Sequence, residues 1–378
     1  MTVASTKGAG MRILHIDTEM TWRGGENQLR LLLEGLATSD IENFVALRPG
    51  SLAADRLKGL AQQVLVPMRG GFDPIAAWRL ADYCRLHKID IIDAHTANAH
   101  MLGLLIRRFY ARPRLVVHRR VDYAPHGGWL NQRKYLSPKV DRYVAISHAI
   151  AGVLTTYGVP SARISVVRSA IKTNGYDDSR RADARAELAR NFGIDPAAAF
   201  IGNASALTHQ KGYEVLINAA AILKRQGENF HIFIAGDGPL QLSLEQQRQA
   251  LGLEHHVTFL GFIKEVPTFL SALDILAVSS HFEGLGTILL DGLAAGLAVA
   301  ATAVGGIPEV IQADRTGLLS ADGDADGLAL NLTRLIRDPA LRQMLNAAGR
   351  SHIAEEFSIG SMVGGNLEIY QEIARSLS

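Results

Sequence analysis

The segment SSHFEGLGT, Ser279–Thr287, joins two apolar runs of different length. Ile275–Val278 before it is as short as a buried strand, and Ile288–Ala294 after it continues as an apolar helical pattern. A strand, a glycine-rich turn and a helix start leave backbone N–H groups without partners, and the helix dipole favours an anion beside them. The segment therefore predicts an α/β sheet with a phosphate site at this turn.

Two carboxylates accompany the turn. Glu283 stands just before it, and Asp291 follows eight residues later. At about 100° per residue, eight residues return a helical side chain to nearly the same face, roughly 12 Å along the axis. We therefore expect one site that holds a phosphate between two carboxylates, as in a nucleotide-sugar pocket. The alternative is a purely structural junction, because turns of this kind occur in every α/β protein.

Strands alternate with helices along almost the whole chain, which favours parallel, doubly wound sheets. Expected strands are Arg12–Asp17, Phe44–Leu47, Val64–Pro67, Ile89–Asp93, Leu115–His118, Arg142–Ile146, Phe200–Ala204, His231–Ala235, Val257–Leu260, Ile275–Val278 and Ala298–Ala301. Between the two series, Ser169–Ser179 is polar and contains glycine, so it is the best linker candidate.

The length of 378 residues suggests two domains. We predict a flexible extension at 1–10, a Rossmann-like domain at 11–170 and a second Rossmann-like domain at 171–358. The last helix, 359–378, is expected to pack back on the first domain. Ligands of open α/β sheets bind at the carboxyl ends of the strands, so the site is expected in the cleft between the domains.

Composition is that of an ordinary soluble protein, with 48% hydrophobic and 20% charged residues. Cys84 is the only cysteine, which excludes a disulfide framework and fits a reducing compartment. Met1–Gly10 lacks the apolar core of a signal peptide, and no apolar run reaches the roughly 18 residues of a membrane helix. We expect a cytoplasmic protein.

The net charge of +2 conceals an asymmetry. Residues 1–160 hold 21 Lys/Arg against 13 Asp/Glu, a net charge of +8, and the remainder is net −6 with 18 against 24. Ten basic residues fall between Arg107 and Arg142, where Trp129 and Leu130 stand beside Arg133-Lys134 as in an interfacial helix. An anionic partner is favoured, namely a phosphate, a nucleic acid or a membrane surface, against the alternative of a solvated basic face.

Several chemistries are disfavoured because their motifs are missing. The first strand is not followed by G-x-G-x-x-G, and the sequence has neither a Walker lysine loop nor a G-x-S-x-G nucleophile elbow. The histidines are scattered without metal-ligand spacing. Hydride transfer, ATP hydrolysis and serine-hydrolase chemistry are therefore disfavoured, and no metal site is predicted.

Other polar residues fall at predicted strand ends. Gly24-Gly25 opens the first helix, and His95 and His118 end two successive strands on one predicted rim. In the second half, Ser205 follows a strand and Lys211 starts a helix, where a cation suits a diphosphate. Each of these residues also has a structural explanation, because glycine pairs, hydrogen-bonded histidines and surface lysines are common.

Taken together, these segments resemble the retaining glycosyltransferases of family 4, which have the GT-B fold, over essentially the whole chain from Met11. The resemblance is carried by Gly24-Gly25-Glu26, His118, Lys211-Gly212, Gly236-Asp237-Gly238-Pro239, and the block from Phe282-Glu283-Gly284 to Gly305-Gly306-Ile307-Pro308-Glu309. The last block is the specific one, since the others would be weak individually.

The resemblance implies roles for individual residues. Glu283 would face the donor sugar, His118 would touch that sugar, and Lys211 would neutralise the diphosphate; these three are the catalytic candidates. Asp291 would hold the ribose hydroxyls. The other donor-binding candidates are Gly24, Gly25, Ser205, Gly284, Leu285, Gly286 and Thr287, and those on the acceptor side are His95, Arg119 and Arg120. No metal and no cofactor is implied.

Three positions depart from the family pattern. Asp291 replaces a glutamate, which shortens the side chain by one methylene. Ala206 stands where the family usually has an arginine, so Lys211 loses a second cation nearby. Ser169-Ala170-Ile171 replaces a common Asn-Gly-Val at the linker. These departures put donor affinity in question more than the fold.

The implied activity is metal-independent transfer of a sugar from a nucleotide diphosphate to an acceptor hydroxyl of a cell-envelope glycan or glycolipid such as lipopolysaccharide, with retention. Expected partners are the donor, the acceptor and an anionic membrane met peripherally through the basic half, with no nucleic acid. The alternatives are a nucleotide-sugar epimerase of the same fold, which needs no acceptor, and a non-enzymatic sugar-binding protein.

Overall fold

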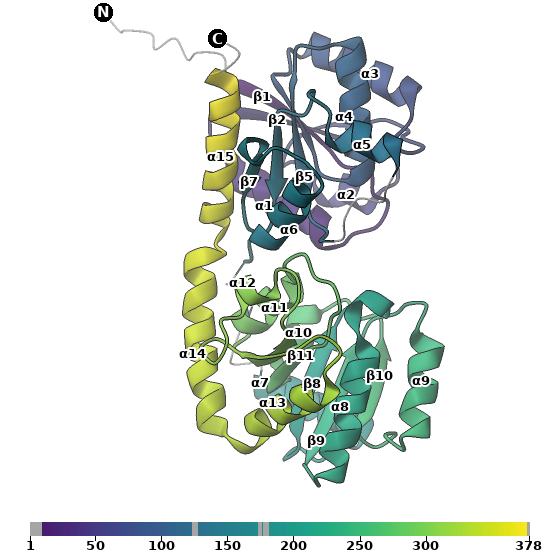
Figure 1. Ribbon diagram of the computed structural model, residues 1–378, viewed down its shortest axis with the longest axis vertical. Coiled ribbons are helices and arrows are strands. Elements are labelled where there is room, and N and C mark those ends of the chain that lie inside the picture. The colour runs from purple at the N-terminus through teal and green to yellow at the C-terminus, as the bar shows by residue number, and fades with distance from the viewer. Residues whose placement is uncertain (1–9, 123–127, 173–175, 177–180, 376–378) are drawn as a thin grey trace, which may run out of the picture. The chain divides into compact units, whose positions relative to one another are not determined.

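The computed structural model describes the chain apart from residues 1–9, 123–127, 173–175, 177–180 and 376–378. The predicted extension at 1–10 thus lies almost entirely outside the described residues. The chain forms two compact units (Figure 1). The N-terminal unit comprises Met1–Ala170 with Ile359–Ser378, and the C-terminal unit comprises Ile171–Ser358.

The N-terminal unit is built on a seven-stranded parallel sheet of order β3-β2-β1-β4-β5-β6-β7. Its strands are β1 (Met11–Ile16), β2 (Ile41–Leu47), β3 (Gln62–Leu65), β4 (Ile91–Ala94), β5 (Arg114–Arg119), β6 (Arg142–Ala145) and β7 (Ile164–Val166). Its helices are α1 (Gly24–Leu36), α2 (Leu52–Arg56), α3 (Pro74–Leu86), α4 (Ala97–Phe109), α5 (Trp129–Tyr135), α6 (His148–Thr156) and α15 (Ile359–Arg375).

Alternate side chains of these strands enter two different cores, as the two-residue period of a strand requires. Leu14 and Ile92 pack with α3 and α4 on one face, whereas Ile13 and Ile91 pack with α1 and α15 on the other. The C-terminal helix α15 lies along α1 (Figure 1). Its Tyr370 is fully buried in that second core. The last helix of the chain therefore completes the first unit.

The C-terminal unit repeats the plan with a six-stranded parallel sheet of order β10-β9-β8-β11-β12-β13. Its strands are β8 (Ala199–Ala204), β9 (Phe230–Ala235), β10 (Val257–Gly261), β11 (Ile275–Val278), β12 (Ala298–Thr302) and β13 (Leu318–Ser320). Its α-helices are α7 (Arg181–Phe192), α8 (Tyr213–Arg225), α9 (Gln241–Ala250), α10 (Val266–Ser271), α11 (Thr287–Ala294), α12 (Ile307–Val310), α13 (Ala325–Arg337) and α14 (Pro339–Glu356).

Strand order reverses beside β1 in the first sheet and beside β8 in the second. In doubly wound sheets, the crevice at the carboxyl ends of the strands flanking such a switch point is where ligands bind. In the C-terminal unit the flanking strands are β8 and β11, and the segments that follow them begin at Ser205 and Ser279. The expected doubly wound architecture is confirmed, and it brings these two segments to one edge.

Some predicted strand bounds were wrong. Val64–Pro67 was expected from its apolar residues, but the strand is Gln62–Leu65, because Phe44 to Leu47 pair with those four residues. The three-residue strands β7 and β13 were too short to show a two-residue period. Among the described helices, none is both long and apolar enough to cross a membrane.

Candidate functional site

The turn between β11 and α11 ends in an uncapped helix. Gly286 is the N-cap residue, in the left-handed region at φ 82°, and it makes no side-chain cap. This positive φ favours glycine, and a Cβ there would also lie 2.8 Å from Leu289 Cδ1, so the leucine side chain would have to move. Leu289 donates to the Gly286 carbonyl, but the N–H groups of Thr287 and Ile288 before it come too early in α11 for a helical acceptor, which makes this end of the helix suited to an anion.

Lys211 lies beside this turn although it comes from the other flanking strand. It ends a short 3-10 helix, His209–Lys211, and its ammonium is 2.5 Å from Glu283 Oε2. The Ser279 hydroxyl donates to the Lys211 carbonyl over 3.2 Å. Gly212, at φ 56°, permits this approach, since a Cβ would stand 2.1 Å from the Ser279 oxygen. The two predicted residues Lys211 and Glu283 therefore meet.

The glycines of the specific block hold the Glu283 loop in place. Glu283 is 8% exposed, and its carbonyl accepts a 2.8 Å hydrogen bond from the Gly306 amide. A Cβ on Gly306 would lie 2.2 Å from the Gly284 oxygen, so only glycine lets the two backbones touch. Leu285 fills the core below at 1% exposure. The motif thus buries a carboxylate beside a cation and a helix N-terminus.

The expectation that helical spacing places Asp291 on the same face as Glu283 was wrong. The helix begins only at Thr287, so the rotation of about 100° per residue does not extend back to Glu283. The Asp291 carboxylate instead accepts a 2.6 Å hydrogen bond from the Tyr176 hydroxyl. Burial raises the pKa of Asp291 to about 6, and the Tyr176 hydrogen bond offsets part of that rise. Tyr176, in the predicted linker, was not identified from the sequence.

In the N-terminal unit, Asp93 forms the centre of a buried polar network at the end of β4. Its carboxylate is 3.0 Å from His118 Nε2, 3.1 Å from His95 Nε2 and 3.2 Å from His15 Nδ1. The Tyr370 hydroxyl donates to it over 2.6 Å. Burial alone would raise the pKa of Asp93, but His118 and His95 hold it well below its usual range. His118 and His95 are therefore brought together, with stacked rings 4.5 Å apart.

The spacing of His15, Asp93 and His95 is also short enough for a metal site. The hydrogen bonds argue against one. The Arg120 guanidinium, which can only donate, lies 3.0 Å from His95 Nδ1, so the His95 proton resides on Nε2, the nitrogen that faces Asp93. Burial lowers the pKa of His95 to about 3, which keeps the ring neutral. This network therefore serves hydrogen bonding.

The two acceptor-side arginines differ. Arg119 is 6% exposed and donates to the Tyr135 hydroxyl over 2.6 Å, so it holds α5. Arg120 lies beside the first helix, 3.6 Å from the position of a Cβ on Gly25. Gly24 is the first residue of α1, and the Arg23 amide before it donates to Glu26. Arg120 and Gly25 are thus neighbours at the carboxyl edge of this sheet.

The remaining predicted residue, Ser205, follows β8, and its hydroxyl is 2.7 Å from that of Tyr213. Ser205 thereby ties the end of β8 to the start of α8. Near that start, His281 bridges Glu214 and Asp322 with contacts of 2.7 and 2.6 Å. Sequence reasoning missed this bridge, and its only signal was the position of His281 two residues before Glu283.

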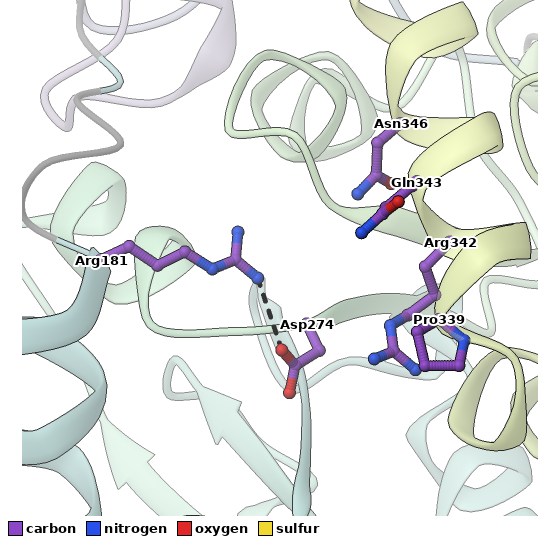
Figure 2. Close-up of a pocket in the computed structure, with 6 residues that line it drawn as sticks. All are labelled: Arg181, Asp274, Pro339, Arg342, Gln343 and Asn346. Atoms are coloured by element: carbon purple, nitrogen blue, oxygen red, sulfur yellow. Dashed lines mark hydrogen bonds and ion pairs between the residues drawn. The ribbon is translucent and has the colours of Figure 1, made fainter.

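A cavity of about 260 Å³ lies elsewhere in the C-terminal unit, next to the start of β11 rather than its end. Figure 2 shows Arg181 reaching from α7 toward Asp274, with Arg342, Gln343 and Asn346 on α14. Asp274 also binds Arg185 over 2.7 Å. Its position at the amino end of the strand separates this cavity from the Glu283 loop, which follows the carboxyl end.

Two protein-family models match the chain. "Glycosyltransferase Family 4" matches residues 22–174, and "Glycosyl transferases group 1" matches residues 184–352. The glycosyltransferase of Rickettsia africae has the same fold, with a TM-score of 0.85, 19% identity and coverage of 97% of this chain and 99% of that one. Anabaena HepE in complex with UDP has a TM-score of 0.83 and 22% identity, with coverage of 96% of this chain and 100% of that one.

The fold is that of the GT-B glycosyltransferases, and the two family models show that the chain is a glycosyltransferase. Within that class, the chain belongs to the family 4 type of glycosyltransferases. A lipopolysaccharide core biosynthesis glycosyltransferase of Rhizobium meliloti, LpsD, is 27% identical over 95% of this chain and 98% of its own. The 2-deoxystreptamine glucosyltransferase of Streptomyces kanamyceticus is 31% identical, over 57% of this chain and only 56% of its own.

Proposed function

We propose that the protein transfers a sugar from a nucleotide diphosphate donor to an acceptor hydroxyl, with retention of anomeric configuration. The observation that carries this proposal is the Lys211–Glu283 pair beside the uncapped N-terminus of α11. A cation and free helix amides suit the two phosphates, while a carboxylate beside them suits the hydroxyls of the attached sugar. The position at a switch point of the sheet supports the same reading.

In this mechanism the protein positions the reactants and stabilises the departing diphosphate. Lys211 and the amides of Gly284 to Thr287 bind the phosphates, and Asp291 binds the ribose. The bond between the anomeric carbon and the phosphate oxygen breaks while the acceptor oxygen forms its bond on the same face. The leaving phosphate oxygen takes the acceptor proton, so neither a metal nor a separate protein base is needed.

Residues of the N-terminal unit are also proposed to bind substrate. Gly24 and Gly25 leave room for close approach of a phosphate, and His118, oriented by Asp93, would touch the sugar. Arg120 and His95 are the acceptor-side candidates at the same edge. Because relatives include lipopolysaccharide core glycosyltransferases, the acceptor proposed is a glycan or glycolipid of the cell envelope.

The decisive experiment measures donor use with and without acceptor. UDP-glucose is the first donor to test, because HepE has been crystallised with it, and GDP- and ADP-sugars follow. We expect nucleoside diphosphate to be released only when a glycan acceptor is added. NMR should show an α-linked product from an α-linked donor. Consumption of donor into a second nucleotide sugar without acceptor would identify an epimerase, and stabilisation without turnover would identify a binding protein.

We also propose that the N-terminal unit meets anionic membranes through α5. Trp129 is 63% and Leu130 57% exposed, and the Arg133 guanidinium lies 5.2 Å from the centre of the Trp129 ring. Lys134 Nζ donates to the Ala97 carbonyl at the start of α4. Exposed apolar side chains flanked by cations suit the interface between headgroups and acyl chains.

A second apolar group lies at the same end of α4. Phe72 is 74% and Ile75 64% exposed at the start of α3, and Gly71 beside them packs against Asn98 of α4.

Cosedimentation with vesicles tests this surface. Binding to phosphatidylglycerol vesicles should fall in Trp129→Ala/Leu130→Ala and persist in Leu242→Ala, a control at 68% exposure in the other unit. Equal binding by the unaltered protein and both variants would refute the proposal that this surface binds membranes.

A further inference from the structure

The structure brings two histidines and a carboxylate together at the start of α8. His281 Nε2 is 2.7 Å from Glu214 Oε1, and His209 Nδ1 is 3.8 Å from the same oxygen. The three ligating atoms all lie within 4.8 Å of one another. They come from the 3-10 helix, the first turn of α8 and the loop after β11, so the cluster exists only in the folded unit.

A fourth residue orients the cluster. Asp322 Oδ1 accepts a hydrogen bond from His281 Nδ1 over 2.6 Å. This leaves Nε2 as the His281 nitrogen that faces Glu214 and His209. In metal sites, a ligating histidine usually donates its other N–H to a carboxylate, which fixes the ring and makes the ligating nitrogen more basic. In the arrangement Asp322–His281–Glu214, His281 thus has the form of a metal ligand and Asp322 that of its supporting carboxylate.

The spacing suits a tetrahedral ion. With metal–ligand distances of about 2.0–2.1 Å, two ligands of a tetrahedral zinc lie about 3.3 Å apart. The separations of 2.7 and 3.8 Å lie on either side of that value, so a shift of about half an ångström in each would reach it. The side chains of His209 and Glu214 are 75% and 35% exposed, which lets an ion enter and leaves a position for water.

We propose that His209, Glu214 and His281 bind one divalent transition-metal ion of the zinc class, with Asp322 as the supporting residue. Two imidazole nitrogens and one carboxylate oxygen favour such an ion over Mg²⁺ or Ca²⁺. The metal takes the place of the proton on His281 Nε2, and that proton goes to solvent. This site differs from the buried His15–Asp93–His95 triangle, whose His95 nitrogen keeps its proton.

The consequence is a cross-link between the two segments that carry Lys211 and Glu283. His209 and Glu214 flank Lys211 in the chain, and His281 precedes Glu283 by two residues. The ion would join these segments without occupying the proposed diphosphate site. Binding is therefore expected to raise the melting temperature of the C-terminal unit, whether or not the protein turns over sugar, so this inference stands apart from the proposed activity.

The experiment uses the full chain stripped with a chelator and titrated with Zn²⁺ against a chromophoric competitor. One equivalent should bind to the unaltered protein. His209→Ala and Asp322→Asn should each weaken that binding about 10- to 100-fold. His255→Ala is the matched control, because His255 is also exposed in this unit but lies outside the cluster, and it should retain the unaltered affinity.

Co²⁺ supplies a second readout that does not depend on activity. The unaltered protein should give the visible absorption of a four-coordinate Co²⁺ ion, and His209→Ala should lose it while keeping its far-UV circular dichroism. Binding of less than one equivalent of metal would overturn the proposal, and so would an affinity that falls equally in His209→Ala and His255→Ala. So would unchanged affinity in both His209→Ala and Asp322→Asn.

Discussion

The ammonium of Lys211 is 2.5 Å from the carboxylate of Glu283, although the two residues are 72 positions apart in sequence. Both side chains are mostly buried, at 18% and 10% exposure, so each compensates the charge of the other. An arriving diphosphate would compete with Glu283 for Lys211. The carboxylate would then be available to the sugar hydroxyls, which gives the pair two distinguishable roles.

Glu283→Gln should separate chemistry from nucleotide binding. The amide keeps the size of the side chain but loses the charge proposed to act on the sugar in the transition state. We expect kcat to fall by about 100-fold or more, with the Kd of nucleoside diphosphate changed by less than about 3-fold. Turnover assays beside calorimetric titrations check this. A parallel loss of both quantities would place Glu283 in phosphate binding instead.

Lys211→Ala should act mainly on the phosphates. Ala206 stands where a second cation is usual, so the loss should exceed that of one ordinary hydrogen bond, at about 2 kcal/mol or some 30-fold in Kd for nucleoside diphosphate. Because Glu283 would be left buried without its cation, melting temperature must be measured as well. Unchanged affinity in a folded variant would remove Lys211 from the site.

Asp291 should impose a pH dependence on nucleotide binding. Its pKa is raised to about 6 by burial, and the ionised form is the better acceptor for ribose hydroxyls. Affinity for nucleoside diphosphate should therefore rise as pH increases from about 5 to 7. Asp291→Asn should bind about 1–3 kcal/mol more weakly at pH 7 and lack this rise. If the variant kept the same pH profile, another group would be responsible.

The same raised pKa has a consequence for folding. Because the folded-state value exceeds that of an ordinary aspartate, Asp291 favours the folded state below about pH 4, and this contribution is lost as pH rises through about 6. The melting temperature of Asp291→Asn relative to the unaltered protein should thus increase over that interval. A constant difference would show that Asp291 ionises without cost.

Gly212→Ala should disrupt the meeting of the two loops. Its φ of 56° strains any side chain, and its Cβ would fall 2.1 Å from the Ser279 oxygen. Gly323→Ala is the control, since its φ of 70° carries similar strain with no atom within 4 Å. We expect about 1 kcal/mol for the control and more than about 2 kcal/mol for Gly212→Ala, measured as loss of thermal stability. Equal losses would mean that the loop containing Ser279 shifts to make room for the added Cβ.

Sugar transfer should persist in EDTA. The residues proposed to hold the diphosphate are Lys211 and the helix amides, and the proposed zinc-class site lies outside that group. The measurement compares initial rates before and after chelation. Loss of activity with rescue by Mg²⁺ or Mn²⁺ would show that a metal bridges the phosphates and would overturn the proposed mechanism.

Local patterns predicted much of the fold. A helix was expected to start at Lys211, and α8 begins two residues later, at Tyr213, because the amphipathic run starts after Gly212. The strand at Ile275–Val278 and the Gly286 turn were predicted from the contrast between an apolar run and the glycines after it. The short edge strand β13 was not predicted, because its position depends on pairing with β12.

By itself, the sequence determined two β–α series, a glycine-rich strand–turn–helix junction and the residue types beside it, since these depend on local periodicity and backbone freedom. Only the tertiary structure decided which polar side chains meet. Tyr176 binds Asp291 across 115 residues, and Tyr370 binds Asp93 across 277. Such pairs are set by which strands become neighbours and by burial, which makes an unpaired polar group costly, and neither property is visible in a local pattern.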